Sequence, residues 1–467
     1  MSNSALLMLF DGLDKKEWRN FRQFLCSPYF NQRKDVIQLF DFIEESRLLK
    51  IVDLDKRKAF QKIFPKENYQ DAKIRHLMSY LMKLLKSFLI QEQIGVDEVH
   101  QKIKLCHVLR KKGMDKMFEK EWLSTQKLQR KQSLRNTHFY YNNYQLNLER
   151  SEYLHQNQRS GEMNLQEMTD ELTTFYIADL LRQACSVLAH QSMNSQIYEL
   201  KLLPTVVQLV EQGWLSDIPA VAIYFHSYRA LNDLKNESDF YRLPILIKEN
   251  WKQFPRAEIR DILVLAINYC IQRLNKGDKE FIREAFELYR FGLEKEILIN
   301  NKILLLYTYK NILKLGLALE EYDWVESYLE HYKKYLDPAE RENNYAHNLA
   351  IFYFSKKDYT KAMNLLQQVD FKDRLHQLDA RRMLLLMYYE LSEFDALESL
   401  LDSFQTYIRR QKDLSYHRDN YLNLIRFIRK MLRLNLDLRA NREDIIKEIN
   451  DTKALAEKAW LLEQLKY

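Results

Sequence analysis

The chain has 467 residues, of which 46% are hydrophobic and 29% charged, and its formal net charge is +7. This composition supplies ample material for a core and excludes an intrinsically disordered chain. Glycine and proline are scarce, with eight and seven copies. So few residues suited to tight turns exclude a large β-sheet protein and argue against glycine-rich phosphate loops, and we predict an all-α protein.

Neither the cysteines nor the apolar stretches point to a secreted or membrane-embedded protein. The longest apolar stretch, Ile262 to Ile271, is about half of the roughly 20 residues that span a bilayer, and it contains Asn268. No basic residue precedes the short apolar run near the first residue, so we expect a cytoplasmic protein. The four cysteines are far apart in sequence and are expected to be buried free thiols: Cys26, Cys106, Cys185 and Cys270.

The first part of the chain predicts two helical regions. Residues 1–98 form an N-terminal helical region, in which Pro28 and Pro65 interrupt helices and the segments 34–49 and 72–91 are helical. Residues 99–164 form a basic connector of two or three long helices, with Gly113 as the internal breaker.

From residue 165 to residue 467 the apolar pattern repeats in pairs of helices. A unit of two helices every 35–40 residues is typical of an α-solenoid. The predicted pairs are 168–190 with 195–212, 217–234 with 238–253, 257–274 with 279–297, 302–318 with 322–336, 344–356 with 359–369, 379–391 with 394–411, and 416–436 with 442–465.

Three consecutive pairs align with one another. Tyr322, Tyr359 and Phe394 each open the second helix of a pair, at spacings of 37 and 35 residues. Counting back from them, equivalent first-helix positions hold Ile312, Leu349 and Leu384, and then Gly316, Tyr353 and Tyr388. Over about 110 residues, best from Asn344 to Val369, this pattern resembles the tetratricopeptide repeat family, whose period is 34.

The resemblance implies an α/α superhelix that binds a protein or peptide along its concave groove. In that family, Lys and Asn side chains on successive first helices can hold a carboxylate, and the equivalent positions here are Lys310, Lys314 and Asn348. Arg381 and Arg382 lie nearby on the next first helix, although Asp379 and Met383 occupy the positions where cations would be wanted. The repeats and the phrase from Ser27 to Asn31 also resemble uncharacterised helical proteins of Bacteroidetes, a likeness that implies no activity.

Two basic stretches support an alternative function, association with nucleic acid. Residues 101–135 contain eleven Lys or Arg against three acidic residues, and residues 405–442 contain ten against three. At helical spacing each stretch places cations on one face, where they could contact phosphates or remain an ordinary solvated surface. The candidate residues are Lys116, Lys120, Lys127 and Lys131 in the first stretch, and Arg426, Arg429, Lys430 and Arg433 within 409–433.

Catalytic and cofactor motifs are absent from the sequence. No GxxxxGK, GxGxxG, HExxH or GxSxG pattern occurs. We therefore predict no cofactor, no metal and no enzymatic activity. The remaining option is an enzyme whose site is assembled from scattered helix residues.

Overall fold

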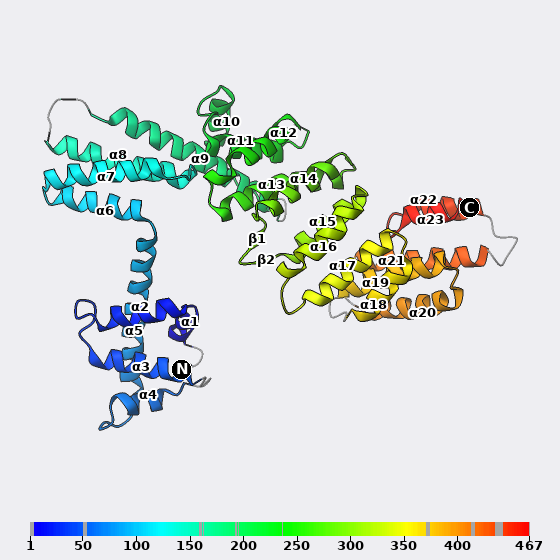
Figure 1. Ribbon diagram of the computed structural model, residues 1–467, viewed down its shortest axis with the longest axis horizontal. Coiled ribbons are helices and arrows are strands. Elements are labelled where there is room, and N and C mark those ends of the chain that lie inside the picture. The colour runs from blue at the N-terminus through cyan, green and yellow to red at the C-terminus, as the bar shows by residue number, and fades with distance from the viewer. Residues whose placement is uncertain are drawn as a thin grey trace. The chain divides into compact units, whose positions relative to one another are not determined.

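The computed structural model confirms an all-α protein (Figure 1). It describes residues 4–49, 54–157, 161, 163–191, 194, 196–235, 237–369, 374–411, 416–434 and 442–466. Contacts divide the chain into two compact units, residues 1–181 with 208–221, and residues 182–207 with 222–467. The only strands among the described residues are the two-residue strands β1 (Ile299–Asn300) and β2 (Ile303–Leu304).

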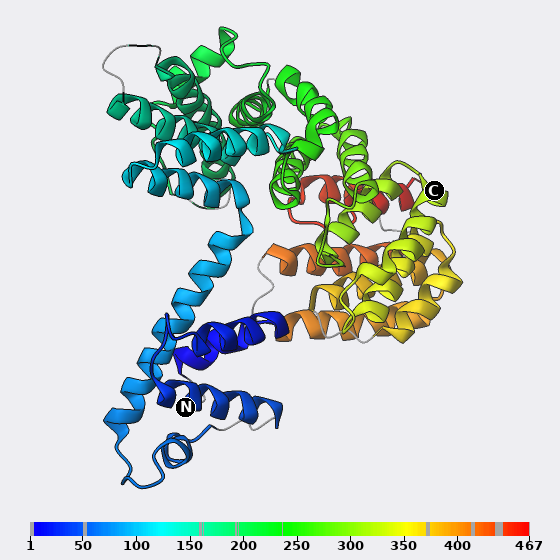
Figure 2. The same cartoon turned by 60° about the vertical axis from the view of Figure 1, so that its left-hand side comes forward.

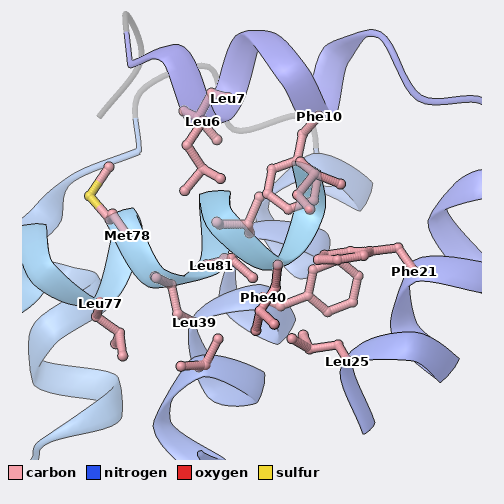
Figure 3. Packing of buried hydrophobic residues seen from close by; sticks show 14 of the residues in the cluster. Leu6, Leu7, Phe10, Phe21, Leu25, Leu39, Phe40, Leu77, Met78 and Leu81 are labelled. Atoms are coloured by element: carbon pink, nitrogen blue, oxygen red, sulfur yellow. The ribbon is translucent and has the colours of Figure 1, made fainter. Parts of the chain in front are cut away.

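The first five helices share one core, in which Phe21 and Phe40 are fully buried and meet edge to face (Figure 3). Asp14 opens α2 with a reciprocal capping box, since its carboxylate accepts from the Glu17 N–H and Glu17 accepts from the Asp14 N–H. These helices are α1 (Ala5–Asp11), α2 (Lys15–Cys26), α3 (Lys34–Leu48), α4 (Lys56–Ile63) and α5 (Asp71–Val96).

The predicted break before Pro28 is confirmed, because Ser27 has extended backbone angles and ends α2. Asn31 closes this turn from inside the protein. Its buried side-chain amide donates to the carbonyls of Leu25 and Arg33, both at 3.0 Å. The phrase from Ser27 to Asn31 thus has a structural role.

Three long helices follow in the first unit, and they share a core that includes Phe118 stacked on Tyr153. The Trp122 indole N–H donates to the Leu146 carbonyl at 3.0 Å and fixes the second helix on the third. The helices are α6 (Glu98–Lys111), α7 (Asp115–Lys131) and α8 (Thr137–Asn157).

Six α-helices and one short 3-10 helix follow in the described part of residues 165–294. The α13–α14 pair is fixed by Arg273, whose guanidinium bonds Asp278 in the turn and Glu237 at the start of α12. The helices are α9 (Leu165–Gln191), α10 (Leu203–Glu211), α11 (Pro219–Asn232), α12 (Glu237–Asn250), η1 (Trp251–Gln253), α13 (Arg256–Asn275) and α14 (Phe281–Glu294).

The six helices from residue 306 to residue 410 form three antiparallel pairs that follow one another in chain order (Figures 1 and 2). The middle pair packs on both of its neighbours through α17, which contacts α15 and α19. The helices are α15 (Leu306–Ala318), α16 (Tyr322–Tyr332), η2 (Lys333–Tyr335), α17 (Arg341–Ser355), α18 (Tyr359–Gln368), α19 (Arg374–Glu390) and α20 (Phe394–Arg410).

The turns inside these three pairs have the same conformation. Each holds one residue with φ near 60°, two positions before the second helix: Glu320, Lys357 and Ser392. The N–H of the following residue then returns to a carbonyl five residues earlier, from Glu321 to Gly316, from Asp358 to Tyr353 and from Glu393 to Tyr388. This is the hydrogen bond of a Schellman helix end. The turns recur with the 37- and 35-residue spacing that the sequence alignment predicted.

The C-terminal helices pack on α19 and α20 in a common core that contains Phe404, Phe427 and Leu461. They are α21 (Tyr416–Leu434), α22 (Arg442–Asp451) and α23 (Lys458–Gln464).

Several local predictions were wrong. Residues 196–202 precede α10 without helix, and the segment predicted as one helix over 442–465 is broken between Asp451 and Lys458. The β1–β2 hairpin was missed. Its turn residues Asn301 and Lys302 both have positive φ, as a two-residue type I′ turn requires. Cys26 is exposed, whereas the other three cysteines are buried as expected.

Candidate functional site

The sequence-predicted groove residues lie on the first helices of the three aligned pairs. Lys310 and Lys314 are on α15, Asn348 is on α17, and Arg381 and Arg382 are on α19. Lys310 and Arg382 belong to a polar cluster that also contains Asp379 and two side chains that sequence reasoning did not single out, His347 and His376.

Two histidines occupy the middle of this cluster. Their rings stack with centroids 4.5 Å apart, and both are buried, His347 with 1% of its surface exposed. Lys310, on α15, forms a hydrogen bond through its Nζ with His376 Nε2. On the other side, His347 Nε2 lies 3.9 Å from the Asp379 carboxylate.

The charges of α19 are held by partners within the protein. Arg382 donates to Asp379 Oδ1 at 2.8 and 3.0 Å and to Glu457 Oε1 at 2.7 Å. Burial by itself would raise the pKa of Asp379, but the charge of Arg382 and its hydrogen bond outweigh burial and lower that pKa. Burial also lowers the pKa of His347 to about 3, and the charge of neighbouring His376 acts in the same direction.

This arrangement differs from an open carboxylate clamp. Asn348 is fully buried, with its amide donating to the Asn344 carbonyl at 2.7 Å, so it does not reach an exposed surface. Arg381 instead lies over the Tyr407 ring at 5.0 Å. Of the five predicted groove residues, only Lys314 is exposed. The cluster is therefore a largely internal network that joins three first helices.

An open cavity of 590 Å³ lies between three earlier helices, α9, α11 and α13. Its volume falls within the range of about 300–1,000 Å³ that is usual for ligand pockets. The lining residues are Arg182, Cys185, Ser186, Ala189, Tyr224, Ala257, Glu258, Asp261, Ile262, Val264, Leu265 and Asn268.

One face of α13 supplies the open wall of this cavity. Asp261, Val264 and Asn268 are exposed there at spacings of three and four residues, which places them on one side of the helix. The neighbouring Ile262 is 1% exposed and belongs to the core. The cavity thus combines an apolar wall with a carboxylate and an amide that face solvent.

At the floor of the cavity, side chains are held in place by hydrogen bonds within the protein. Tyr224 on α11 is buried, and its hydroxyl donates to Glu258 Oε1 at 2.8 Å. Burial, followed by the nearby carboxylate, raises the pKa of this phenol. The Cys185 thiol donates to the Tyr224 carbonyl at 3.4 Å, and burial raises its pKa as well. Both groups are therefore neutral structural elements at physiological pH.

Sequence reasoning did not find this cavity. The signal that was present is Asn268, a polar residue that interrupts the longest apolar stretch of the chain. Because the walls come from helices about 40 residues apart, their convergence depends on packing that no local pattern encodes.

The first basic face is intact in the structure. Lys116, Lys120, Lys127 and Lys131 are all exposed on α7, and within the described part of the chain none of them forms an ion pair. The second face is largely neutralised. Arg426 and Lys430 approach Glu448 of α22, and Arg429 bonds Asp402 of α20 at 2.6 Å. Arg433 is exposed.

Comparison with known proteins assigns no relative, since no protein-family model, no curated protein and no solved structure matches the chain. Within the described ranges, no cluster of three or more His, Cys, Asp or Glu side chains could hold a metal ion. The helices in those ranges also include none that is long and apolar enough to cross a bilayer.

Proposed function

We propose that this protein is a non-enzymatic interaction scaffold that binds a peptide or helix of a partner protein along the first helices of its pairs. The observation that carries the proposal is the cavity between α9, α11 and α13, which three successive first helices line together. The repeated turns of residues 320, 357 and 392 support a repeat architecture of the tetratricopeptide-like kind.

The lining of the cavity favours an anchor side chain with an apolar stem and a polar or cationic end. Val264 and Leu265 offer apolar surface beside Asp261, an exposed carboxylate. Lysine and arginine side chains have this form, because they pack their methylene groups on apolar surface and keep the charge in water. The anchor therefore differs from the carboxylate that the sequence resemblance implied.

A peptide-display selection tests the proposal. Random peptides would be selected on the full chain, and their binding then measured on Asp261→Lys and on Glu280→Lys. Both variants make the same charge change on exposed residues, but Glu280 precedes α14 and lies outside the cavity. We expect selected peptides to contain a basic residue next to apolar ones, and to lose at least about tenfold in affinity for Asp261→Lys only.

Two results would count against this function. Selection could enrich no peptide, or the two variants could weaken the selected peptides equally. A third variant, Val264→Arg, fills the cavity mouth without removing the carboxylate and should also abolish binding. Circular dichroism of each variant separates loss of binding from loss of fold.

A further inference from the structure

A row of lysines follows one side of α7. Lys116, Lys120, Lys127 and Lys131 are separated by four, seven and four residues. At 3.6 residues per turn they fall within an arc of about 60°. All four are exposed, and the side chain of Leu123, between the two lysine pairs, is exposed as well.

The acidic residues of α7 are held elsewhere. Glu119 forms an ion pair with Arg150 of α8, with an N···O distance of 2.6 Å, and Glu121 accepts a hydrogen bond from Lys102 of α6 at 2.6 Å. Asp115 accepts from Asn157 at the end of α8. The carboxylates of α7 thus have partners on the neighbouring helices, and among the residues that the structure describes none forms an ion pair with a lysine of the row.

The contrast with α21 shows that this is not a general property of basic helices in the chain. Three of the four candidate cations of that helix, Arg426, Arg429 and Lys430, approach two carboxylates, Asp402 of α20 and Glu448 of α22. An external polyanion would have to compete with those internal partners. The lysine row of α7 forms no ion pair within the described ranges, so an external polyanion would not displace one there.

The spacing of the row fits a duplex. Lys120 and Lys127 are about 10.5 Å apart along the helix axis at 1.5 Å per residue. The major groove of B-form DNA is about 12 Å wide. A helix laid across the groove would place Lys116 and Lys120 at one phosphate backbone, and Lys127 and Lys131 at the other.

We propose that α7 binds the phosphate backbones of duplex DNA across the major groove through these four lysines, without reading sequence. The two exposed residues between the lysine pairs are Leu123 and Ser124, and neither can make the bidentate hydrogen bonds by which Arg, Asn and Gln read base edges. Binding is then dominated by counterion release.

Fluorescence anisotropy with a labelled, mixed-sequence duplex of about 20 base pairs tests this at several salt concentrations. Four phosphate contacts predict a slope of log K against log salt of about −3.6, or roughly a 150-fold loss of affinity between about 50 and 200 mM salt. Each single Lys→Gln substitution should make the slope shallower by about 0.9. The quadruple Lys→Gln variant should not bind, and the quadruple Lys→Arg variant should bind.

The control is the triple variant Arg426→Gln, Arg429→Gln, Lys430→Gln, which should leave the affinity and the slope unchanged. The proposal is overturned if the full chain does not bind the duplex at low salt, or if the quadruple Lys→Gln variant binds as the unaltered chain does. It is also overturned if polyglutamate of equal charge competes as well as the duplex, which would assign the row to an acidic protein. If the quadruple Lys→Gln variant proves unfolded, the single substitutions and the Lys→Arg variant carry the test.

Discussion

The imidazole rings of His347 on α17 and His376 on α19 stack with their centroids 4.5 Å apart. Sequence reasoning had assigned both of these helices to an open groove. Lys310 stands on one side of this pair, and Asp379 and Arg382 stand on the other. Burial of His347 disfavours its protonated form and lowers its pKa, and the nearby Asp379 carboxylate only partly offsets this effect. His347 is therefore neutral in the folded protein at physiological pH.

Acid should destabilise the protein through His347. Its folded-state pKa of about 3 lies below the ordinary value of 6.5, so the unfolded chain binds the proton first. The stabilisation is complete above about pH 6.5 and is lost as the pH falls towards 3, costing about 2 kcal/mol by pH 5. The thermal midpoint from circular dichroism should fall over this range. His347→Asn should flatten the dependence, whereas His331→Asn, at an exposed position of α16, should not.

Gly316→Ala should destabilise the α15–α16 pair. A Cβ at this position would lie 2.4 Å from Val325 Cγ2 on α16 and 3.2 Å from Phe286 Cε2 on α14. To make room for it, α15 would have to move away from both of these helices. We expect a loss of about 1–3 kcal/mol, seen as faster hydrogen exchange of α15 and α16. Gly95→Ala is the control, because the nearest atom is the side chain of Gln101 at 3.8 Å. There the better helix propensity of alanine should leave exchange of α5 unchanged or slower.

Arg273 should be the most sensitive cation of the second unit. It is 8% exposed and bonds Glu237, Asp278 and the carbonyl of Leu234. Arg273→Met would leave these acceptors without their partner, and we expect a loss of about 3 kcal/mol in the opening free energy of α13. Arg256→Met removes an exposed pair with Glu296 and should cost less than about 1 kcal/mol. Equal effects of the two substitutions would show that the network around Arg273 contributes no more stability than an exposed ion pair.

The cysteines should separate into two classes in the native protein. Cys26 is exposed, whereas Cys106 is fully buried and burial raises the pKa of its thiol to about 11. A short pulse of iodoacetamide, read by peptide mass spectrometry, should label Cys26 and leave Cys106, Cys185 and Cys270 intact. Full denaturation should label all four. Rapid native labelling of any buried thiol would mean that its helices open more readily than their packing indicates.

Much of the fold could be predicted because the apolar spacing that indicates a helix can be recognised within a short stretch of sequence. Apolar spacing located α3, α5 and the pairs from α13 to α20 within a few residues, and the 37- and 35-residue spacing predicted turns that the structure shows to be equivalent. The β1–β2 hairpin could not be found in this way, since strands of two residues are too short to show an alternating pattern.

The sites were harder to predict because they depend on partners distant in sequence. Residue type alone could not reveal that Arg429 is matched by Asp402 or Lys430 by Glu448, each on another helix. Asn348 was assigned to an open surface by repeat alignment, but its side chain is fully buried and its amide donates to the Asn344 carbonyl. The lysine row of α7 was predictable because its geometry is set within one helix.

The three equivalent turns have a consequence for the evolution and engineering of this chain. Glu320, Lys357 and Ser392 adopt a left-handed conformation that costs a residue with a Cβ about 1 kcal/mol and costs glycine almost nothing. The same kind of helix end is made with glycine at Gly113, Gly213 and Gly277. A substitution to glycine at any of these three exposed positions should therefore stabilise the protein without changing a core contact. Such a substitution could compensate for a destabilising change elsewhere, for example one that enlarges the cavity between α9, α11 and α13.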